Sequence, residues 1–165
     1  MRFGTPQRFV CRQYSKSEPG DPIPFYALGR IHELEGNITQ AIERFEYAAQ
    51  APTYFFADFR LWGVYKFLRN KPKEAQAMLQ RYEEKLPKLT KGDEQVKWIL
   101  KHVLADEFLF DAGYYDRRGD ADNAIRALQM GLTVVPSNLR TRYLQLIRPK
   151  LEDQRIIAWI DQQHR

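Results

Sequence analysis

The sequence predicts an all-α protein, and three observations support this fold class. Between residues 22 and 52, apolar side chains recur at helical spacing on both sides of a Gly36-Asn37 turn, which is the pattern of two short amphipathic helices. The succession of alanine, a large apolar residue and proline in the second helix recurs 34 residues later and once more before Pro136. The 165 residues, 44% apolar and 28% charged, suit about one domain with a continuous core.

The first helical hairpin contains a predicted close contact between its two helices. Two small residues, Gly29 in the first helix and Ala41 in the second, stand where one helix must approach the other. Phe45 is the large side chain that we expect to fill the space beside them. Pro52 ends the hairpin because proline cannot continue a helix.

This hairpin resembles a tetratricopeptide repeat, whose pattern combines bulky apolar, small and aromatic residues at fixed positions before a terminal proline. Only His32 departs plainly from that pattern, and Pro52 comes one residue early. The positions that match are Phe25, Leu28, Gly29, Ala41, Phe45, Ala48 and Pro52.

Two further copies extend the resemblance over residues 22 to 136. The second copy contains Phe59, Trp62, Gly63, Ala75, Leu79 and Pro87, and the third contains Gly119, Ala124, Leu128, Gly131 and Pro136. The third alanine lies 49 residues after Ala75, which indicates an insertion of about four helical turns. The resemblance implies a right-handed α-solenoid of about three hairpins with C-terminal capping helices. A pentatricopeptide-type repeat, also a helical hairpin, is the alternative.

An aromatic stripe and two prolines predict the second hairpin. Residues 53–70 form its first helix, in which the stripe consists of Tyr54, Phe55, Phe56, Phe59, Trp62, Tyr65 and Phe67. Pro72 suits the first turn of the partner helix, which is predicted over residues 73–86. Pro87 closes that helix, and residues 88–92 form a basic loop.

A long helix is predicted from residue 94 to residue 118, with Asp93 as its cap. At 1.5 Å per residue this helix is about 37 Å long, roughly twice an ordinary repeat helix. Its extra turns either cap the second hairpin or project toward a partner. Its expected apolar face consists of Val96, Ile99, Leu100, Val103, Leu104, Phe108 and Ala112.

Shorter helices complete the predicted chain. The Gly119-Asp120 turn leads into a helix over residues 121–135, and Pro136 starts another helix, which Pro149 breaks. Residues 149–165 read as a C-terminal amphipathic helix. This helix either packs back as the final cap, which we favour because a repeat stack needs closing, or lies on a partner.

The first fourteen residues differ in charge from the rest of the chain. Residues 1–14 contain three arginines and no acid, which is the composition of a mitochondrial targeting segment. The run Arg12-Gln13-Tyr14-Ser15 resembles the site that the matrix processing peptidase reads. A basic arm without a targeting role is the alternative.

The sequence therefore predicts four parts. They are a targeting segment at 1–14, a linker at 15–21, a repeat domain at 22–148 and a C-terminal helix at 149–165. The expected location is the mitochondrial matrix or the matrix side of the inner membrane.

Composition and motifs argue against several classes of function. The chain beyond residue 14 has 23 basic and 21 acidic residues, so its bulk charge does not imply a dominant phosphate-binding surface. No run approaches the roughly 18 apolar residues that a bilayer span needs, and Cys11 alone cannot form an internal disulfide. His32, His102 and His164 fall on separate segments, and no nucleotide-binding or hydrolase motif occurs. We predict no catalytic residue, cofactor or metal site.

The repeat resemblance implies a concave partner-binding groove lined by the first helix of each hairpin. In that interpretation Tyr26 and Phe67 anchor a peptide or helix of the partner, and Arg30 and Arg60 make charge contacts with it. The alternative for Phe67 and its neighbour Val64 is packing against the long helix. The groove positions are Tyr26, Arg30, Arg60, Val64, Phe67, Leu109 and Asp116.

One function of related repeats is not expected in this chain. Chaperone-binding tetratricopeptide proteins hold a C-terminal carboxylate with Lys, Asn and Arg side chains at their groove positions. The corresponding residues are Tyr26, Arg30, Leu61, Asp106 and Phe110, four of which are uncharged or acidic. Binding of chaperone EEVD tails is therefore not expected.

These features favour a non-catalytic protein–protein interaction scaffold. We expect an accessory or structural subunit of a mitochondrial multisubunit assembly, either a respiratory complex or the ATP synthase, with other protein subunits as partners and no direct membrane span. The first alternative is a mitochondrial ribosome- or RNA-associated helical-repeat protein, which a clustered basic stripe would support. The second is a free tetratricopeptide adaptor. The basic residues near the end are Arg140, Arg142, Arg148, Lys150 and Arg155.

Overall fold

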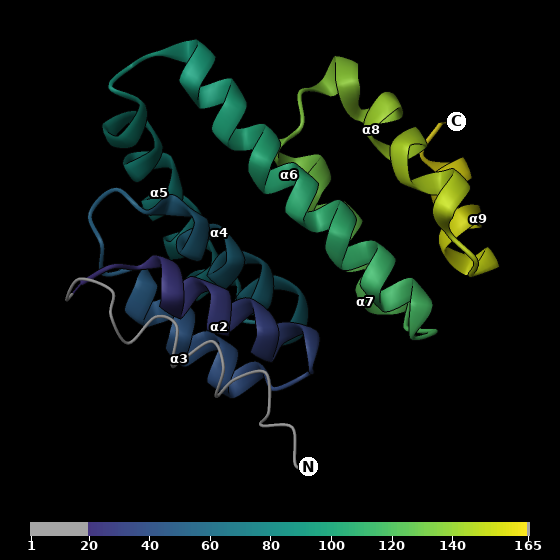
Figure 1. Ribbon diagram of the computed structural model, residues 1–165, viewed down its shortest axis with the longest axis horizontal. Helices are drawn as coiled ribbons and strands as arrows, with labels where there is room; N and C mark the ends of the chain where they lie inside the picture. The colour runs from purple at the N-terminus through teal and green to yellow at the C-terminus, as the bar shows by residue number, and fades with distance from the viewer. Residues whose placement is uncertain (1–19, 165) are drawn as a thin grey trace, which may run out of the picture. The chain divides into compact units, whose positions relative to one another are not determined.

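A computed structural model of the chain describes residues 20–164 (Figure 1). These residues form eight α-helices, α2 to α9, and no strand, which confirms the predicted all-α fold class. They separate into two compact units with the boundary between Asp93 and Glu94. This boundary lies inside the range 22–148 that the sequence predicts as one repeat domain. The targeting segment predicted at 1–14 lies outside the described residues.

The first unit begins with the predicted helical hairpin. Helix α2 (Ile23–Leu34) packs against helix α3 (Ile38–Ala48), and Gly36, with a φ of 80°, makes the turn between them. A Cβ placed on Gly29 would lie only 2.5 Å from the ring of Phe45, which is fully buried. The predicted close approach at Gly29 is therefore confirmed.

The second helix pair of this unit differs from its prediction in one respect. Helix α4 (Phe55–Gly63) continues into a five-residue π-helix (Val64–Leu68) instead of remaining α-helical through residue 70. In this segment the Arg69 amide donates to the Val64 carbonyl at 3.0 Å, an i to i−5 bond that widens the turn. Asn70, with a φ of 50°, then ends the segment.

The prediction that Pro87 closes the partner helix is wrong. Helix α5 (Pro72–Thr90) packs against α4 and continues for three residues beyond Pro87. The last turn is retained because Leu86 and Thr90, four residues apart on one face, are both buried. Lys91 and Gly92 have positive φ and end the helix, so residues 91–93, not 88–92, form the connection.

Aromatic side chains fill the interior where the two hairpins of the first unit meet. The buried Tyr26 ring lies 5.7 Å from Phe45, 5.5 Å from Tyr54 and 5.9 Å from Phe56, measured between centroids. Such tilted and edge contacts add to the area that these rings bury. Helices α3 and α4 pack together around this cluster.

The second unit contains the predicted long helix and its three neighbours. Helix α6 (Glu94–Arg117) packs along α7 (Ala121–Val134), within one residue of the predicted bounds. A short 3-10 turn (Ser137–Leu139) leads into α8 (Arg140–Ile147), which also packs on α7. The chain ends with α9 (Gln154–Gln162).

Helix α9 packs back onto α7, the outcome that the sequence favours for the C-terminal segment. Its two isoleucines, Ile156 and Ile160, are fully buried. On α6, the buried Asp116 carboxylate accepts hydrogen bonds from the Glu152 amide at 3.0 Å and the Asp153 amide at 2.9 Å. The C-terminal helix is thus an integral part of the second unit.

Candidate functional site

Three of the predicted groove residues are buried in the first unit. The Tyr26 hydroxyl accepts a hydrogen bond from Arg60 Nε at 3.2 Å, and Arg60 Nη1 lies 3.7 Å from a Glu33 carboxylate oxygen. The side chains of Tyr26, Arg60 and Val64 are almost inaccessible to solvent. Tyr26 and Arg60 therefore contribute to the interior of the unit, and their removal is expected to affect folding before binding.

The other four predicted residues have different environments. Arg30 and Phe67 in the first unit and Leu109 in the second are half-buried. The Asp116 carboxylate is buried and bound to the backbone that precedes α9. The predicted groove requires residues from both units at once, and it stays a prediction.

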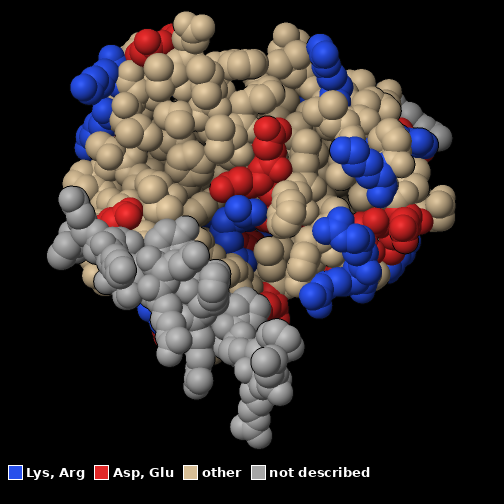
Figure 2. Space-filling view, in the orientation of Figure 1, with Lys and Arg blue, Asp and Glu red and all other residues tan. Residues whose placement is uncertain are grey.

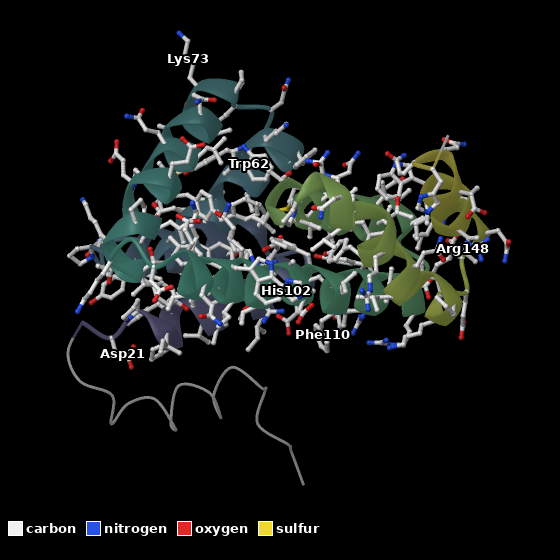
Figure 3. All side chains as sticks on the ribbon, turned by 90° about the horizontal axis from the view of Figure 1, so that it is seen from above. Asp21, Trp62, Lys73, His102, Phe110 and Arg148 are labelled. Atoms are coloured by element: carbon white, nitrogen blue, oxygen red, sulfur yellow. The ribbon has the colours of Figure 1, made fainter. Side chains whose placement is uncertain are left out.

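Helix α6 has two apolar faces, whereas the sequence predicts one. Leu104, Phe108 and Ala112 are buried as expected. Four other apolar residues of α6 form an exposed stripe, which we call the α6 stripe and which consists of Val96, Ile99, Val103 and Phe110. Phe110, labelled in Figure 3 together with His102, is 59% exposed. The sequence predicts Val96, Ile99 and Val103 on the same apolar face as the buried residues, whereas the structure leaves these three side chains exposed.

Beside this stripe, α6 and α8 enclose an open cavity of about 400 Å³, which we call the α6–α8 groove. One wall comes from α6, where Trp98, His102 and Asp106 follow one another at intervals of four residues. The other wall and the floor come from the end of α7 and from α8. The residues on that side are Val135, Leu139, Arg142, Tyr143 and Leu146.

The groove combines a fixed floor with exposed rims. Tyr143 is buried, and its hydroxyl donates a hydrogen bond to the Ala105 carbonyl at 2.8 Å, which fastens α8 to α6. Trp98 and Leu146 are 50% and 54% exposed. The Trp98 ring stacks on His102 with centroids 4.6 Å apart and an interplanar angle of 23°. Large apolar groups are therefore presented to solvent on a rigid base.

The groove contains two charged side chains. Asp106 and Arg142 are both exposed and have opposite charges on opposite walls. Catalysis would need a nucleophile or base held by a second group in a protected site. Among residues 20–164 no three His, Cys, Asp or Glu side chains gather as a metal site would require. The arrangement can bury an apolar ligand surface and orient its charges.

Gly131 on α7 is required for the floor of the groove. A Cβ on Gly131 would overlap the Tyr143 hydroxyl. We expect Gly131→Ala to lower the free energy of unfolding by about 1–3 kcal/mol, because the ring cannot move without losing its bond to Ala105. Urea denaturation of the purified protein measures this change.

The matched control is Gly113→Ala on α6. Its added methyl would meet only Arg117 Nη1 at 3.5 Å and Ile147 Cδ1 at 3.8 Å, which are ordinary contacts. The gain in helix propensity, up to about 1 kcal/mol, should stabilise the protein. Equal losses in both variants would show that the Tyr143 contact is not the cause.

Of the groove residues, His102, Asp106 and Arg142 enter the predictions from sequence only in other roles. The sequence does contain a signal for the α6 stripe beside the groove. At 100° per residue, its members Val96, Ile99, Val103 and Phe110 project within about 60° of one another. The centre of this arc lies about 150° from that of Leu104, Phe108 and Ala112. A surface helix with apolar residues on opposite sides indicates a second packing partner.

None of the helices among the described residues is both long and apolar enough to cross a membrane. Comparison of the chain with protein-family models, with curated proteins and with solved structures finds no match. The case for the groove as the functional site therefore rests on its own geometry.

Proposed function

We propose that the protein is a non-catalytic interaction module that binds a segment of a partner protein in the α6–α8 groove. The observation that carries this proposal is the pair of half-exposed apolar rims, Trp98 and Leu146, on the buried floor of Tyr143. Exposed aromatic anchors beside a rigid pocket are typical of the centres of protein interfaces. In this proposal the hairpins are tetratricopeptide-like repeats of a right-handed α-solenoid.

A protein segment suits this site better than a small molecule. Small-molecule pockets enclose most of the ligand surface, whereas both rims of this groove are open to solvent. The α6 stripe adds further apolar surface on the same helix beyond the groove. A ligand that covered both would need the length of a peptide or helix.

We further propose that the partner belongs to a mitochondrial multisubunit assembly, in which this chain is an accessory subunit. The support is the acid-free, arginine-containing composition of residues 1–14, which favours import into the matrix. A respiratory complex or the ATP synthase is the kind of assembly we favour, because the rest of the chain is nearly neutral.

Association with RNA has weaker support. Two of the basic residues near the end are used in ion pairs, because Arg148 lies 2.7 Å from Asp161 and Arg155 lies 2.7 Å from Asp153. On the face in Figure 2, basic side chains lie among acidic and uncharged ones instead of forming a continuous basic surface. A phosphate backbone would meet a mixed surface there.

The experiment is affinity purification of the tagged full chain from mitochondria in mild detergent, followed by mass spectrometry with and without RNase. Co-purification of the subunits of one complex, unchanged by RNase, is expected. Recovery of ribosomal proteins or RNA that RNase releases would instead support the RNA-associated alternative. Recovery of neither would leave a free adaptor.

Leu146→Arg tests whether the groove is the binding site. We expect the variant to lose its co-purifying subunits, because a charged side chain on the rim cannot be buried against an apolar partner. Its free energy of unfolding should stay within about 0.5 kcal/mol of wild type, since Leu146 is exposed. Leu89→Arg on α5, also an exposed leucine, is the control and should retain the subunits. Retention by both variants would show that the partner binds elsewhere.

A further inference from the structure

The shape of the groove indicates the form of its occupant. On α6 the wall residues Trp98, His102 and Asp106 span eight residues, which is about 12 Å along the helix axis. On the α8 side Leu139, Arg142 and Leu146 also recur at helical spacing. Two helical walls of about two turns each favour an occupant that is itself a helix.

The α6 stripe supports the same form. Its members lie at intervals of three, four and seven residues and span about 21 Å, the length of a 14-residue helix. This spacing is that of the apolar seam between two packed helices. Asp106 projects within about 40° of Ile99 and Phe110, so it lies between the stripe and the groove. One amphipathic helix can therefore contact both surfaces.

The charges of the groove indicate the chemistry of that helix. Asp106 stands on the α6 wall and Arg142 on the α8 wall, and among the described residues neither takes part in an ion pair. An occupant with a single sign of charge, such as a nucleic acid or an anionic membrane, would be attracted by one wall and repelled by the other. A helix with a base on one flank and an acid on the other satisfies both walls.

We infer that the α6–α8 groove binds an amphipathic helix of a partner protein whose apolar face is flanked by a basic residue toward Asp106 and an acidic residue toward Arg142. The apolar face covers Trp98 and Leu146. Because the two charges are exposed, they set the orientation of the helix and the choice of partner more than the strength of binding. This inference rests on the proposed function, since it names the occupant of the same groove.

A displayed library of 16-residue amphipathic helices tests the inference. The apolar positions are fixed, and the two flanking positions vary among Lys, Glu and Ala, so that the library contains each charge order and its reverse. Selection is carried out on the immobilised full chain. Wild type should enrich one order of Lys and Glu over the reverse order by about three- to tenfold.

The charge-swapped double variant, Asp106→Lys with Arg142→Glu, is the decisive comparison. It keeps the number of charges in the groove and should enrich the reverse order. Leu146→Arg is the negative control and should enrich no helix. Circular dichroism and thermal unfolding verify that each variant is folded like wild type.

The outcomes separate the inference from the proposed function. Enrichment of helices by both proteins without a preferred charge order would overturn the inference and leave the groove as a binding site. No enrichment over Leu146→Arg would overturn the proposed function as well. Reversal of the preferred order in the swapped variant would establish the inference.

Discussion

Lys85→Met is expected to lower the free energy of unfolding by about 3–5 kcal/mol at neutral pH, because it leaves a buried carboxylate without its main partner. Lys85 Nζ lies 2.6 Å from Asp58 Oδ2, and the Asp58 side chain is 0% exposed. Methionine is unbranched and similar in length to the aliphatic part of lysine, so the substitution removes the charge but little of the packing. Urea denaturation at pH 7 measures the loss.

The cluster around Asp58 joins the two hairpins of the first unit. Asp58 is on α4, whereas Lys85 and Arg81, whose Nε lies 3.0 Å from Asp58 Oδ1, are on α5. Both cations also donate to the Ala49 carbonyl at the end of α3. Carbonyls at helix C-termini lack intrahelical partners and favour positive charge. Loss of Lys85 therefore weakens two connections at once.

The same variant should make stability more dependent on pH. Burial raises the pKa of the Asp58 carboxyl above its ordinary value, and Lys85 and Arg81 oppose this only in part. A raised carboxyl pKa means that stability is lost as pH rises from the unfolded pKa through the folded one. Lys85→Met removes an opposing charge and raises that pKa further. Its loss of stability should be smaller at pH 5 than at pH 8.

The double variant Asp58→Asn with Lys85→Met distinguishes charge from packing. It removes both members of the closest pair and preserves their shapes, so it should regain at least half of the stability that Lys85→Met loses. A single variant within about 1 kcal/mol of wild type would contradict the assigned role of the pair. The role would also be contradicted if the losses of stability in the single variants Asp58→Asn and Lys85→Met simply added in the double variant.

The sequence predicts the helices of this protein well because their signals are local. The Gly36 turn, Pro72 in a first turn and the Gly119-Asp120 turn all act within one or two helical turns. The end of α5 was predicted wrongly because the burial of Thr90, a tertiary effect, outweighs the cost of Pro87 within the last turn. The buried Asp58 cluster was not predicted at all, because it joins side chains that are 23 and 27 residues apart.

The candidate site was harder to predict than the fold for a related reason. Binding residues assigned through the repeat resemblance depend on which helical faces stay open after packing. Tyr26 and Arg60 instead bond to each other inside the first unit. The α6–α8 groove depends on α8, which packs on α7 and is joined to α6 by a hydrogen bond from Tyr143 to Ala105, 38 residues away. No local pattern encodes such a contact.

Gly29→Ala is expected to destabilise the wild-type protein by about 1–3 kcal/mol and to stabilise a Phe45→Ala variant. In wild type the new methyl would lie 2.5 Å from the Phe45 ring, which is fully buried. Phe45→Ala alone should cost about 3–5 kcal/mol, because it empties the centre of the first hairpin. In that background the added methyl enters the vacated space and also gains up to about 1 kcal/mol of helix propensity.

The change of sign separates a direct contact from a general effect of substituting glycine in α2. Urea denaturation of the wild type, the two single variants and the double variant completes a cycle whose coupling energy should be about 2–3 kcal/mol. If Gly29→Ala destabilised both backgrounds equally, the cost would arise from the backbone of α2 rather than from the Phe45 ring. A coupling of the expected size would instead show that the small residue at position 29 and the large one at position 45 are a complementary pair. The hairpin that begins the fold would then depend on the fit between these two side chains more than on either residue alone.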